Sequence, residues 1–390
     1  LFMGLTVSAE EIIRDRKILK RESFLNLSWN SYLMSKLSIL FSLSAVQTLS
    51  FVVIGNSILE IDGVTFSFWL VLFSTACFAN VLGLNISSAF NSAVTVYVMI
   101  PLLLIPQMIL SGLLFKFEKL NNLISTKGKV PVVADLMASR WAYEAMAVDQ
   151  FIHNQYNEPF YSFDRDASIS DFHSAYLIPE LRARNQYVLD HLKSDDDSVK
   201  RTVRQDLEMI RAHLAAESYR KGMEGVDPAQ LTMQTYTPEL GRRFQLYLDD
   251  LTAHYQQLYN QQVSTRDKKM AFFEKRGHNL NAEKDAYYNE SLADLVRNTS
   301  VKDRLIAYRG KLIQQHDPIY QRVIPAGWWD YRAPFFAPEK HLAGLTLETY
   351  TFNIGVIWLM AAGCYLALYG EWLRKFVNMF SKVNFPVKRA

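Results

Sequence analysis

The sequence is poor in cysteine and lacks the common nucleotide-binding and metal-binding motifs. Cys77 and Cys364 are the only two cysteines in 390 residues, and both lie in long apolar stretches, which excludes a disulfide-stapled fold. No Gly-x-x-x-x-Gly-Lys-Ser/Thr run, no His-Glu-x-x-His and no closely spaced cysteine pair occurs. The sequence therefore offers no catalytic residue, no cofactor-binding residue and no metal ligand.

The charge balance argues against another class of partner. The formal net charge is only +3. Residues 151–345 hold 26 Lys and Arg against 27 Asp and Glu, and the rest of the chain holds 16 against 12. A nucleic-acid-binding surface needs a concentrated excess of basic side chains. We therefore expect no nucleic-acid partner.

Long apolar stretches without charge are the main positive feature. They cover residues 37–59, 64–86, 93–115 and 349–370. A helix of about 20 apolar residues crosses roughly 30 Å of hydrocarbon, because each residue adds about 1.5 Å. Strand patterns are nearly absent from the rest of the chain. The sequence therefore predicts an all-α, multi-pass membrane protein, with a helical transmembrane bundle and a large α-helical insert between its last two spans.

Basic residues near both ends of the chain indicate which side faces the cytoplasm. Arg14, Arg16, Lys17, Lys20 and Arg21 precede the first complete span, and further basic residues follow the last one. Short basic segments remain in the cytoplasm. Four helices that cross the membrane one after another place both basic segments in the cytoplasm. Residues 116–345, between the third and fourth of these helices, then lie outside. We expect the inner (plasma) membrane of a bacterium.

Residues 168–323 have the pattern of long polar helices, predicted over 168–193, 198–221, 238–262, 267–276 and 282–322. Apolar residues recur there at helical spacing, and Gly and Pro residues separate the stretches. The recurring positions are Leu207, Ile210, Leu214, Leu246, Leu248, Leu251, Tyr255 and Leu258. The pattern predicts a helical hairpin or small bundle that protrudes from the membrane.

Residues 116–150 are partly apolar and are predicted to form a short re-entrant or interfacial segment. Arg140 and Glu144 lie one helical turn apart there, so the two side chains can pair. An aromatic group precedes the last span: Trp328, Trp329, Tyr331, Phe335 and Phe336. The simpler interpretation is an aromatic belt at the outer headgroup level. The other is a lateral contact for a lipid-like substrate or a partner.

Polar residues within the apolar stretches are candidates for a translocation path, because hydrocarbon penalises a polar group unless it faces protein or a cavity. The alternative for each is a hydrogen bond between helices that stabilises their packing. A proline adds a bend and frees a carbonyl group. The candidates are Gln47, Asn80, Asn85, Asn91, Pro106, Gln107 and Ser111.

The charged segment before the first complete span has a narrow apolar stripe formed by Ile12, Ile18, Leu19 and Leu25. Such a helix lies along the inner leaflet. It serves either as an anchor to anionic lipid or as a docking element for a cytoplasmic partner. The candidate coupling residues are Glu10, Glu11, Arg14, Arg16, Lys17, Arg21 and Glu22.

Three ordered motifs resemble the permeases of G-subfamily, ABC-2 type, ATP-binding cassette (ABC) transporters. Residues 21–37, which begin Arg-Glu and end Ser-Tyr-Leu-Met-Ser-Lys-Leu, are similar to the start of the family's third span. Residues 105–115, Ile-Pro-Gln-Met-Ile-Leu-Ser-Gly-Leu-Leu-Phe, are similar to its fifth span. Residues 139–145, Ser-Arg-Trp-Ala-Tyr-Glu-Ala, are similar to its re-entrant segment. The resemblance covers about 1–150 and 345–390.

The resemblance implies a division of the chain as the C-terminal part of a transmembrane domain. Its segments are the end of the second span and the cytoplasmic connecting helix (1–25), spans three to five (26–115), the re-entrant segment (116–150), an extracytoplasmic helical domain (151–344), the last span (345–370) and a cytoplasmic basic tail (371–390). The family's outer loop is usually much shorter than 151–344. The role of this insert is therefore not implied by the resemblance.

The resemblance also implies partners and a function. It implies an ABC ATPase domain, N-terminal on the same polypeptide, which binds ATP and Mg, and a second copy or homologous half in the lipid bilayer. The predicted function is then the membrane part of an ATP-driven exporter of a lipidic or amphipathic substrate. The alternative is a non-transporting scaffold that transmits motion to periplasmic proteins through 151–344. A channel is disfavoured because no charged ring lines the spans.

Overall fold

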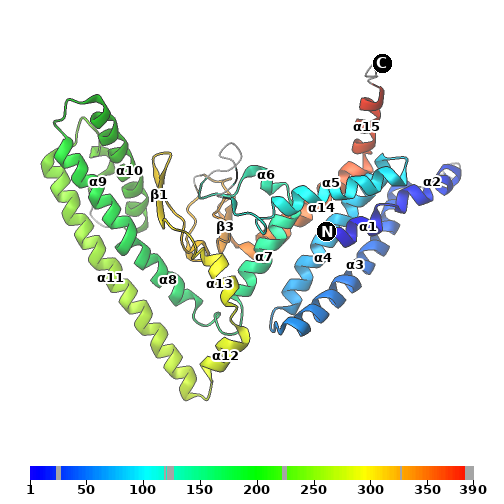
Figure 1. Cartoon of the computed structure of the whole chain (residues 1–390), viewed down its shortest axis with the longest axis horizontal. Coiled ribbons are helices and arrows are strands. Elements are labelled where there is room, and N and C mark those ends of the chain that lie inside the picture. The colour runs from blue at the N-terminus through cyan, green and yellow to red at the C-terminus, as the bar shows by residue number, and fades with distance from the viewer. Residues whose placement is uncertain (23–27, 118–119, 121–126, 222–225, 326, 383–390) are drawn as a thin grey trace. The chain divides into compact units, whose positions relative to one another are not determined.

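The computed structural model describes residues 1–390 except 23–27, 118–119, 121–126, 222–225, 326 and 383–390 (Figure 1). It divides into two compact units. The first unit comprises residues 1–153, 325–333 and 339–390, and the second comprises 154–324 and 334–338. Each unit has its own core, so each is described by itself.

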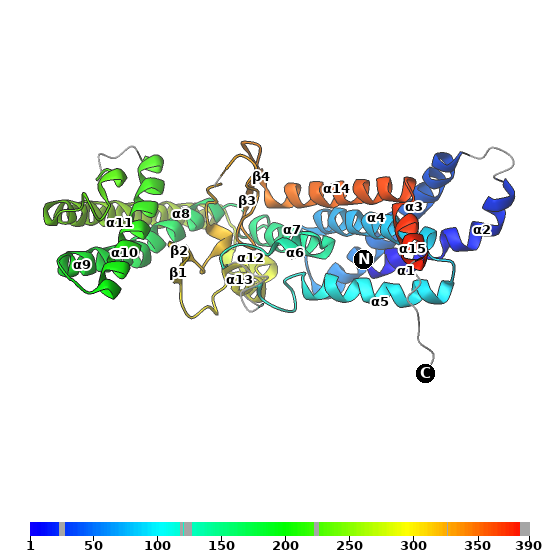
Figure 2. The same ribbon diagram turned by 90° about the horizontal axis from the view of Figure 1, so that it is seen from above.

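In the first unit, α4 (Thr65–Ala89) is the central helix. The helices that pack most extensively against it are α1 (Phe2–Ser8), α3 (Trp29–Leu59), α7 (Ala138–Ile152) and α14 (Thr349–Tyr369) (Figure 2). In an apolar 18-residue segment of α4, 67% is buried, whereas the corresponding share is 28% in α3 and in α14. Apolar side chains of α3 such as Ile39 and Val46 are exposed, as lipid-facing side chains are.

Three of the four predicted spans form helices long and apolar enough to cross a membrane: α3, α4 and α14. The fourth, α5 (Ala93–Ile109), has 17 residues and stops before the predicted end at 115. It tolerates Pro101 and Pro106 within the helix. Gly112 has a φ of 83°, a left-handed conformation that ends a helix at little cost for glycine. At about 1.5 Å per residue, α5 is shorter than the hydrocarbon layer.

Close contact between α1 and α4 depends on two glycines. A Cβ on Gly4 would lie 2.8 Å from the carbonyl oxygen of Ala76, and one on Gly83 would lie 2.0 Å from Ser8 Oγ. Helices in lipid associate through such small residues, because these let two backbones approach. The same chain region continues into α2 (Glu11–Glu22). The remaining elements of this unit are α6 (Val132–Asp135), β3 (Glu339–Leu342), β4 (Leu345–Glu348) and α15 (Trp372–Lys382).

The second unit is a helical bundle, as predicted. α8 (Tyr161–Phe172) continues through the π-helical turn η3 (His173–Leu177) into α9 (Ile178–His191). α10 (Asp197–Lys221) packs on α9, and α11 (Pro238–Lys275) packs on α8 and α9 (Figure 1). The core contains most of the predicted apolar positions. Leu246 is an exception and is 65% exposed, because it lies on a different face of α11 from its neighbours Leu248 and Leu251.

The helix predicted over 282–322 is not continuous. α12 (Leu280–Tyr287) and α13 (Glu290–Arg297) are followed by an antiparallel hairpin of β1 (Leu305–Tyr308) and β2 (Lys311–Gln314), and then by the short helix η5 (Pro318–Tyr320). Arg309 and Gly310 at the turn have φ values of 49° and 74°, the two left-handed residues of a type I′ turn. In the first unit, Ala343 and Gly344 join β3 to β4 in the same way. Helices dominate both units, and the predicted all-α membrane fold class is confirmed.

Candidate functional site

The predicted pair on α7 is present and fully buried. Arg140 is 2% exposed and Glu144 is not exposed at all. The Nη2 atom of Arg140 lies 3.6 Å from the Oε2 atom of Glu144. The two residues face the same side of α7 because they are four positions apart. A charged pair without solvent needs further polar partners, since burial of charge is costly.

Those partners come from β3 and α14. Lys340 Nζ donates a hydrogen bond to Glu144 Oε2 and a second one, of 3.0 Å, to Asn353 Oδ1. The amide of Asn353 donates to Glu144 Oε2 at 2.8 Å and to the carbonyl oxygen of Trp141 at 3.0 Å. Lys340 is 1% exposed and Asn353 is fully buried. One carboxylate therefore joins α7, the β3–β4 hairpin and α14.

A second carboxylate completes the cluster. Asp135 Oδ1 lies 3.6 Å from Arg140 Nη1, and Tyr331 donates its hydroxyl to Asp135 Oδ2 at 3.1 Å. The ring of Trp141 covers both cations, with its centroid 3.8 Å from the Arg140 guanidinium and 4.6 Å from Lys340 Nζ. Two cations and two carboxylates thus form a charge-balanced group under aromatic rings. We call Asp135, Arg140, Glu144, Lys340 and Asn353 the buried ion cluster.

Burial shifts the proton affinities within the buried ion cluster. It raises the pKa of Asp135, and the nearby Arg140 charge offsets this only in part. Burial alone would also raise the pKa of Glu144, but the charges of Arg140 and Lys340 and two hydrogen bonds outweigh it and lower that pKa. Burial lowers the pKa of Lys340 to about 7, against the opposing effect of Glu144. Among these groups, Lys340 is therefore the one whose pKa lies near neutral pH.

Sequence analysis missed Lys340 and Asn353. The rule that singled out polar residues in apolar stretches applies equally to Asn353, within 349–370, and could have found it. Lys340 lies in the short strand β3, two residues after Pro338, and a lysine is ordinarily exposed. Only its contact with Glu144, 196 residues away, distinguishes it.

The predicted coupling helix is α2, and it is attached to two spans. Lys36 of α3 lies 2.7 Å from Glu11 Oε2 and 2.6 Å from Asp15 Oδ2. Tyr32 donates its hydroxyl to Asp15 at 3.1 Å. Tyr32 and Lys36 are the Tyr and Lys of the Ser-Tyr-Leu-Met-Ser-Lys-Leu motif. Asp15 was not among the predicted residues, although it contacts Lys36 as closely as Glu11 does.

The end of α4 holds the other side of α2. Ser87 Oγ accepts hydrogen bonds from the backbone amides of Ile12 and Ile13, at 3.0 and 3.1 Å. Arg16 donates to the carbonyl oxygens of Phe90 at 2.7 Å and Ser88 at 3.2 Å, and also to the Asn91 side chain. A cation at a helix C-terminus neutralises the partial negative charge of the free carbonyl groups.

The remaining coupling residues separate into two groups. Glu10 lies near Tyr97 of α5, and Arg14 pairs with Glu11. Lys17 and Arg21 are exposed. The side chain of Glu22 lies outside the part of the chain that the structure describes. The predicted set therefore contains both anchors and solvent-facing charges.

Three of the candidate path residues form hydrogen bonds to neighbouring helices. Asn80 donates to Ser44 Oγ of α3 at 2.8 Å, and Asn85 donates to the Cys364 carbonyl oxygen of α14 at 2.8 Å. Gln107 Oε1 accepts from the Ser139 amide of α7 at 3.1 Å.

Three further path candidates lie at or near helix ends, and one lies mid-helix. The Ser111 hydroxyl donates a hydrogen bond to the Met108 carbonyl oxygen at 2.7 Å, in the turn after α5. The Pro106 carbonyl oxygen accepts a hydrogen bond from the Leu110 amide at 2.9 Å. Asn91 binds Arg16, as described. Gln47 is half-buried on α3 and forms no hydrogen bond to any residue that the structure describes.

The residues of the predicted aromatic belt differ in exposure and are divided between the two units. Trp328 and Trp329 are 66% and 69% exposed. Tyr331 instead points into the first unit, onto Asp135. Phe335 and Phe336 belong to the second unit, and Phe336 is 5% exposed. Short aromatic runs in irregular backbone alternate between inward and outward positions, which sequence spacing alone does not specify.

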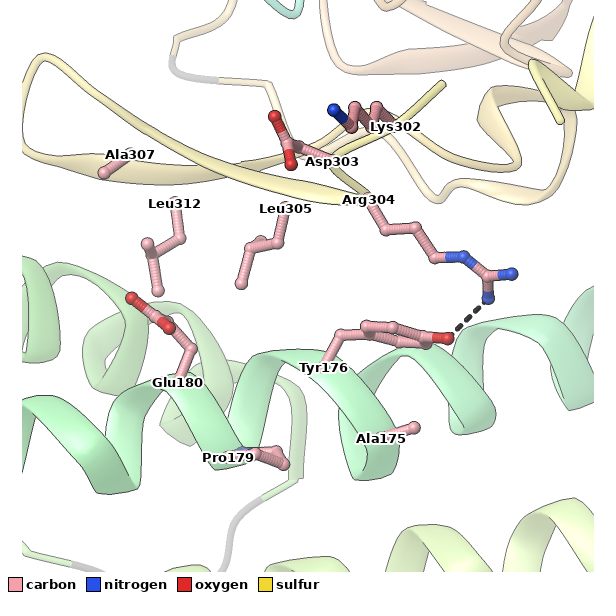
Figure 3. Close-up of a pocket in the computed structure, with 10 residues that line it drawn as sticks. All are labelled: Ala175, Tyr176, Pro179, Glu180, Lys302, Asp303, Arg304, Leu305, Ala307 and Leu312. Carbon is pink, nitrogen blue, oxygen red and sulfur yellow. Dashed lines mark hydrogen bonds between the residues drawn. The ribbon is translucent and has the colours of Figure 1, made fainter. Parts of the chain in front are cut away.

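The second unit contains a cleft of about 520 Å³ between the η3–α9 segment and the β1–β2 hairpin (Figure 3). Leu305 and Leu312 point into it, and Glu180 and Arg304 lie along its edges. Arg304 Nη1 donates to the Tyr176 hydroxyl at 2.6 Å. No residue of the cleft was predicted, because the hairpin was expected to be helical. Within the described residues, no group of three His, Cys, Asp or Glu could hold a metal ion.

Comparison with known proteins agrees with the membrane part of this arrangement. Residues 1–151 match the family model described as ABC-2 type transporter. The matched range contains α1 to α7, except for the last residue of α7, with all three motifs quoted above. No curated protein and no solved structure matches the chain. Residues 1–151 are thus similar to the membrane domain of ABC-2 type transporters, which supports a role as a transporter permease component.

Proposed function

We propose that this chain is the membrane-spanning part of an ATP-driven exporter that is coupled through α2 to an ABC ATPase domain outside residues 1–390. The attachment of α2 is the observation that carries the proposal. Lys36 and Arg16 tie α2 to the start of α3 and to the end of α4. A displacement of α2 is therefore transmitted to two spans at once, because both of its faces are held by ionic hydrogen bonds.

The solvent-facing side of α2 is basic and suits a docking role. Arg14, Lys17 and Arg21 are exposed there. Lys17 is the clearest probe, because it forms no ion pair with any residue that the structure describes. An ATPase domain with an acidic groove would meet this side without disturbing the anchors. Complementary charge of this kind fixes the orientation of two partners.

The composition of the spans supports a lipidic or amphipathic substrate. α4, α5 and α14 contain no Asp, Glu, Lys or Arg. The amides of Asn80, Asn85 and Gln107 are engaged in contacts between helices. A path lined by such helices offers few groups for an ion or a sugar, whereas an acyl chain needs none. We place the transporter in the inner membrane of a bacterium, with a second copy or a homologous half beside it.

The test is reconstitution of the chain with its ATPase domain in proteoliposomes. ATP hydrolysis and the export of a fluorescent lipid are measured together for the wild type and for Lys17→Glu. We expect Lys17→Glu to reduce export per ATP by about fivefold or more, because it reverses one docking charge. Lys275→Glu, an equally exposed reversal at the end of α11, is the matched control. Unchanged export per ATP in Lys17→Glu would contradict the docking role.

A second candidate function is a scaffold that does not transport. The observation that favours it is the second unit, which has its own core and an open cleft. In this alternative, ATP-driven motion would act on periplasmic proteins bound to residues 154–324. ATP hydrolysis that is normal while no lipid moves, together with loss of a bound protein on deletion of this unit, would favour the scaffold over the exporter.

A further inference from the structure

An apolar stripe runs along α15, the helix that follows the last span. Trp372, Phe376 and Met379 are 62%, 56% and 58% exposed. They occupy positions i, i+4 and i+7, which lie on one face of an α-helix. Large side chains at this spacing are ordinarily buried in a soluble protein. Their common exposure therefore marks a surface made for an apolar environment.

A second side of α15, next to the stripe, is polar and basic. Arg374, Lys375 and Asn378 are exposed. Arg374 Nη1 lies 3.0 Å from Glu371 Oε1, at the start of the helix. An apolar face beside a basic face is the pattern of a helix that lies in the membrane interface. Its apolar side chains enter the acyl region while its lysines and arginines meet lipid phosphate groups.

The short connection to α14 places α15 next to the end of the last span and turns it across that span. Only Gly370 and Glu371 separate the two helices. Glu371 has a φ of 50°, a left-handed conformation that stops the helix instead of extending it. In both views α15 runs across the direction of α14 (Figure 1, Figure 2). A helix that leaves the end of a span and turns across it lies at the membrane surface, parallel to the bilayer plane.

We propose that α15 is an interfacial helix that binds the surface of an anionic phospholipid bilayer, with Trp372, Phe376 and Met379 in the lipid. Charge complementarity selects this occupant, because Arg374 and Lys375 stand where phosphate headgroups lie. Continuity with the last span keeps the helix at the bilayer whatever the chain transports. The proposal is therefore independent of the exporter function. A protein partner on the same stripe is the competing occupant, and the test distinguishes the two.

The test uses single-cysteine variants of the chain in which Cys77 and Cys364 are replaced by Ala. Met379→Cys, on the stripe, and Asn378→Cys, on the polar side, are labelled with an environment-sensitive fluorophore. The protein is placed in phosphatidylcholine vesicles with and without phosphatidylglycerol, and with lipids that carry a quencher in the acyl chain. We expect the label at 379 to be quenched about threefold or more strongly than the label at 378.

Charge provides a second readout. Arg374→Glu with Lys375→Glu should lower the ratio of lipid-bound to free α15 by about fivefold or more for each basic residue lost, only in vesicles with phosphatidylglycerol. Equal quenching at 378 and 379 would overturn the proposal. A label at 379 that is shielded from water yet not quenched by the lipid would overturn it in favour of a protein partner. Phe376→Cys repeats the measurement if Met379→Cys does not fold.

Discussion

Lys340 Nζ donates a hydrogen bond to Glu144 Oε2, and neither side chain is more than 1% exposed, although 196 residues separate them in the chain. Glu144 lies on α7, shortly before the chain leaves the first unit, and Lys340 lies where the chain returns to it. Asn353 binds both and belongs to α14. These contacts therefore tie α7 to β3 and α14, close to the points where the chain leaves the first unit and returns to it.

Removal of Lys340 is expected to destabilise the first unit strongly. Lys340→Met leaves the Glu144 carboxylate buried with Arg140 as its nearest cation, and loss of one partner of a buried pair costs about 3–5 kcal/mol. The double variant with Glu144→Gln should be less destabilised than Lys340→Met alone, because no uncompensated charge remains. Thermal unfolding of the detergent-solubilised chain measures both. Equal stability of the single variant and the wild type would contradict this assignment.

The same lysine predicts a pH dependence. Burial lowers the pKa of Lys340 to about 7 in the folded chain, from 10.5 when unfolded. Between these values the unfolded chain binds more protons, so the free energy of unfolding rises with pH, by up to about 1.4 kcal/mol per pH unit. Lys340→Met should lack this rise. The difference between the two stability curves isolates the lysine, and a difference that does not change with pH from 7 upwards would exclude the shift.

Arg16 and Lys17 are adjacent in sequence but are expected to respond differently to mutation. Arg16→Ala removes hydrogen bonds to the end of α4 and should lower the free energy of unfolding by about 1–2 kcal/mol. Lys17→Ala, at an exposed site, should change it by less than about 0.5 kcal/mol. Denaturation followed by tryptophan fluorescence compares the pair directly. Similar losses in both variants would mean that Arg16 is not an anchor.

Close packing of α1 on α4 can be tested with glycines. Gly83→Ala places a Cβ 3.1 Å from the Leu5 carbonyl oxygen and 2.0 Å from Ser8 Oγ, so the Ser8 hydroxyl must rotate away and α1 must shift slightly, at a cost of about 1–3 kcal/mol. Gly55→Ala in α3 meets no atom within 4 Å and should be neutral or stabilising by about 0.5–1 kcal/mol, because alanine favours helix. Thermal unfolding of both variants decides. An unaffected Gly83→Ala would show that α1 does not pack here.

Local sequence patterns were sufficient where a feature depends on neighbours along the chain. The spans α3, α4 and α14 follow from uninterrupted apolar runs, and the Arg140–Glu144 pair follows from a spacing of four. The end of α5 and the two hairpins were missed for a different reason. Gly112, Gly310 and Gly344 adopt positive φ angles, and a glycine permits such a conformation without requiring it. The apolar run through 115 and the helix predicted over 282–322 therefore concealed the turns at Gly112 and Gly310.

The amino-acid sequence by itself determined the helical membrane class, the three long spans and the basic helix α2, because hydrophobic length and helical periodicity are properties of one continuous segment. Tertiary structure alone decided which charges are anchors and which are exposed. Lys340 and Asn353 acquire their role only when β3 and α14 pack on α7, and Arg16 differs from Lys17 only because the end of α4 lies beside it. Burial removes water from those groups, and a charge without water must find its partner elsewhere in the chain.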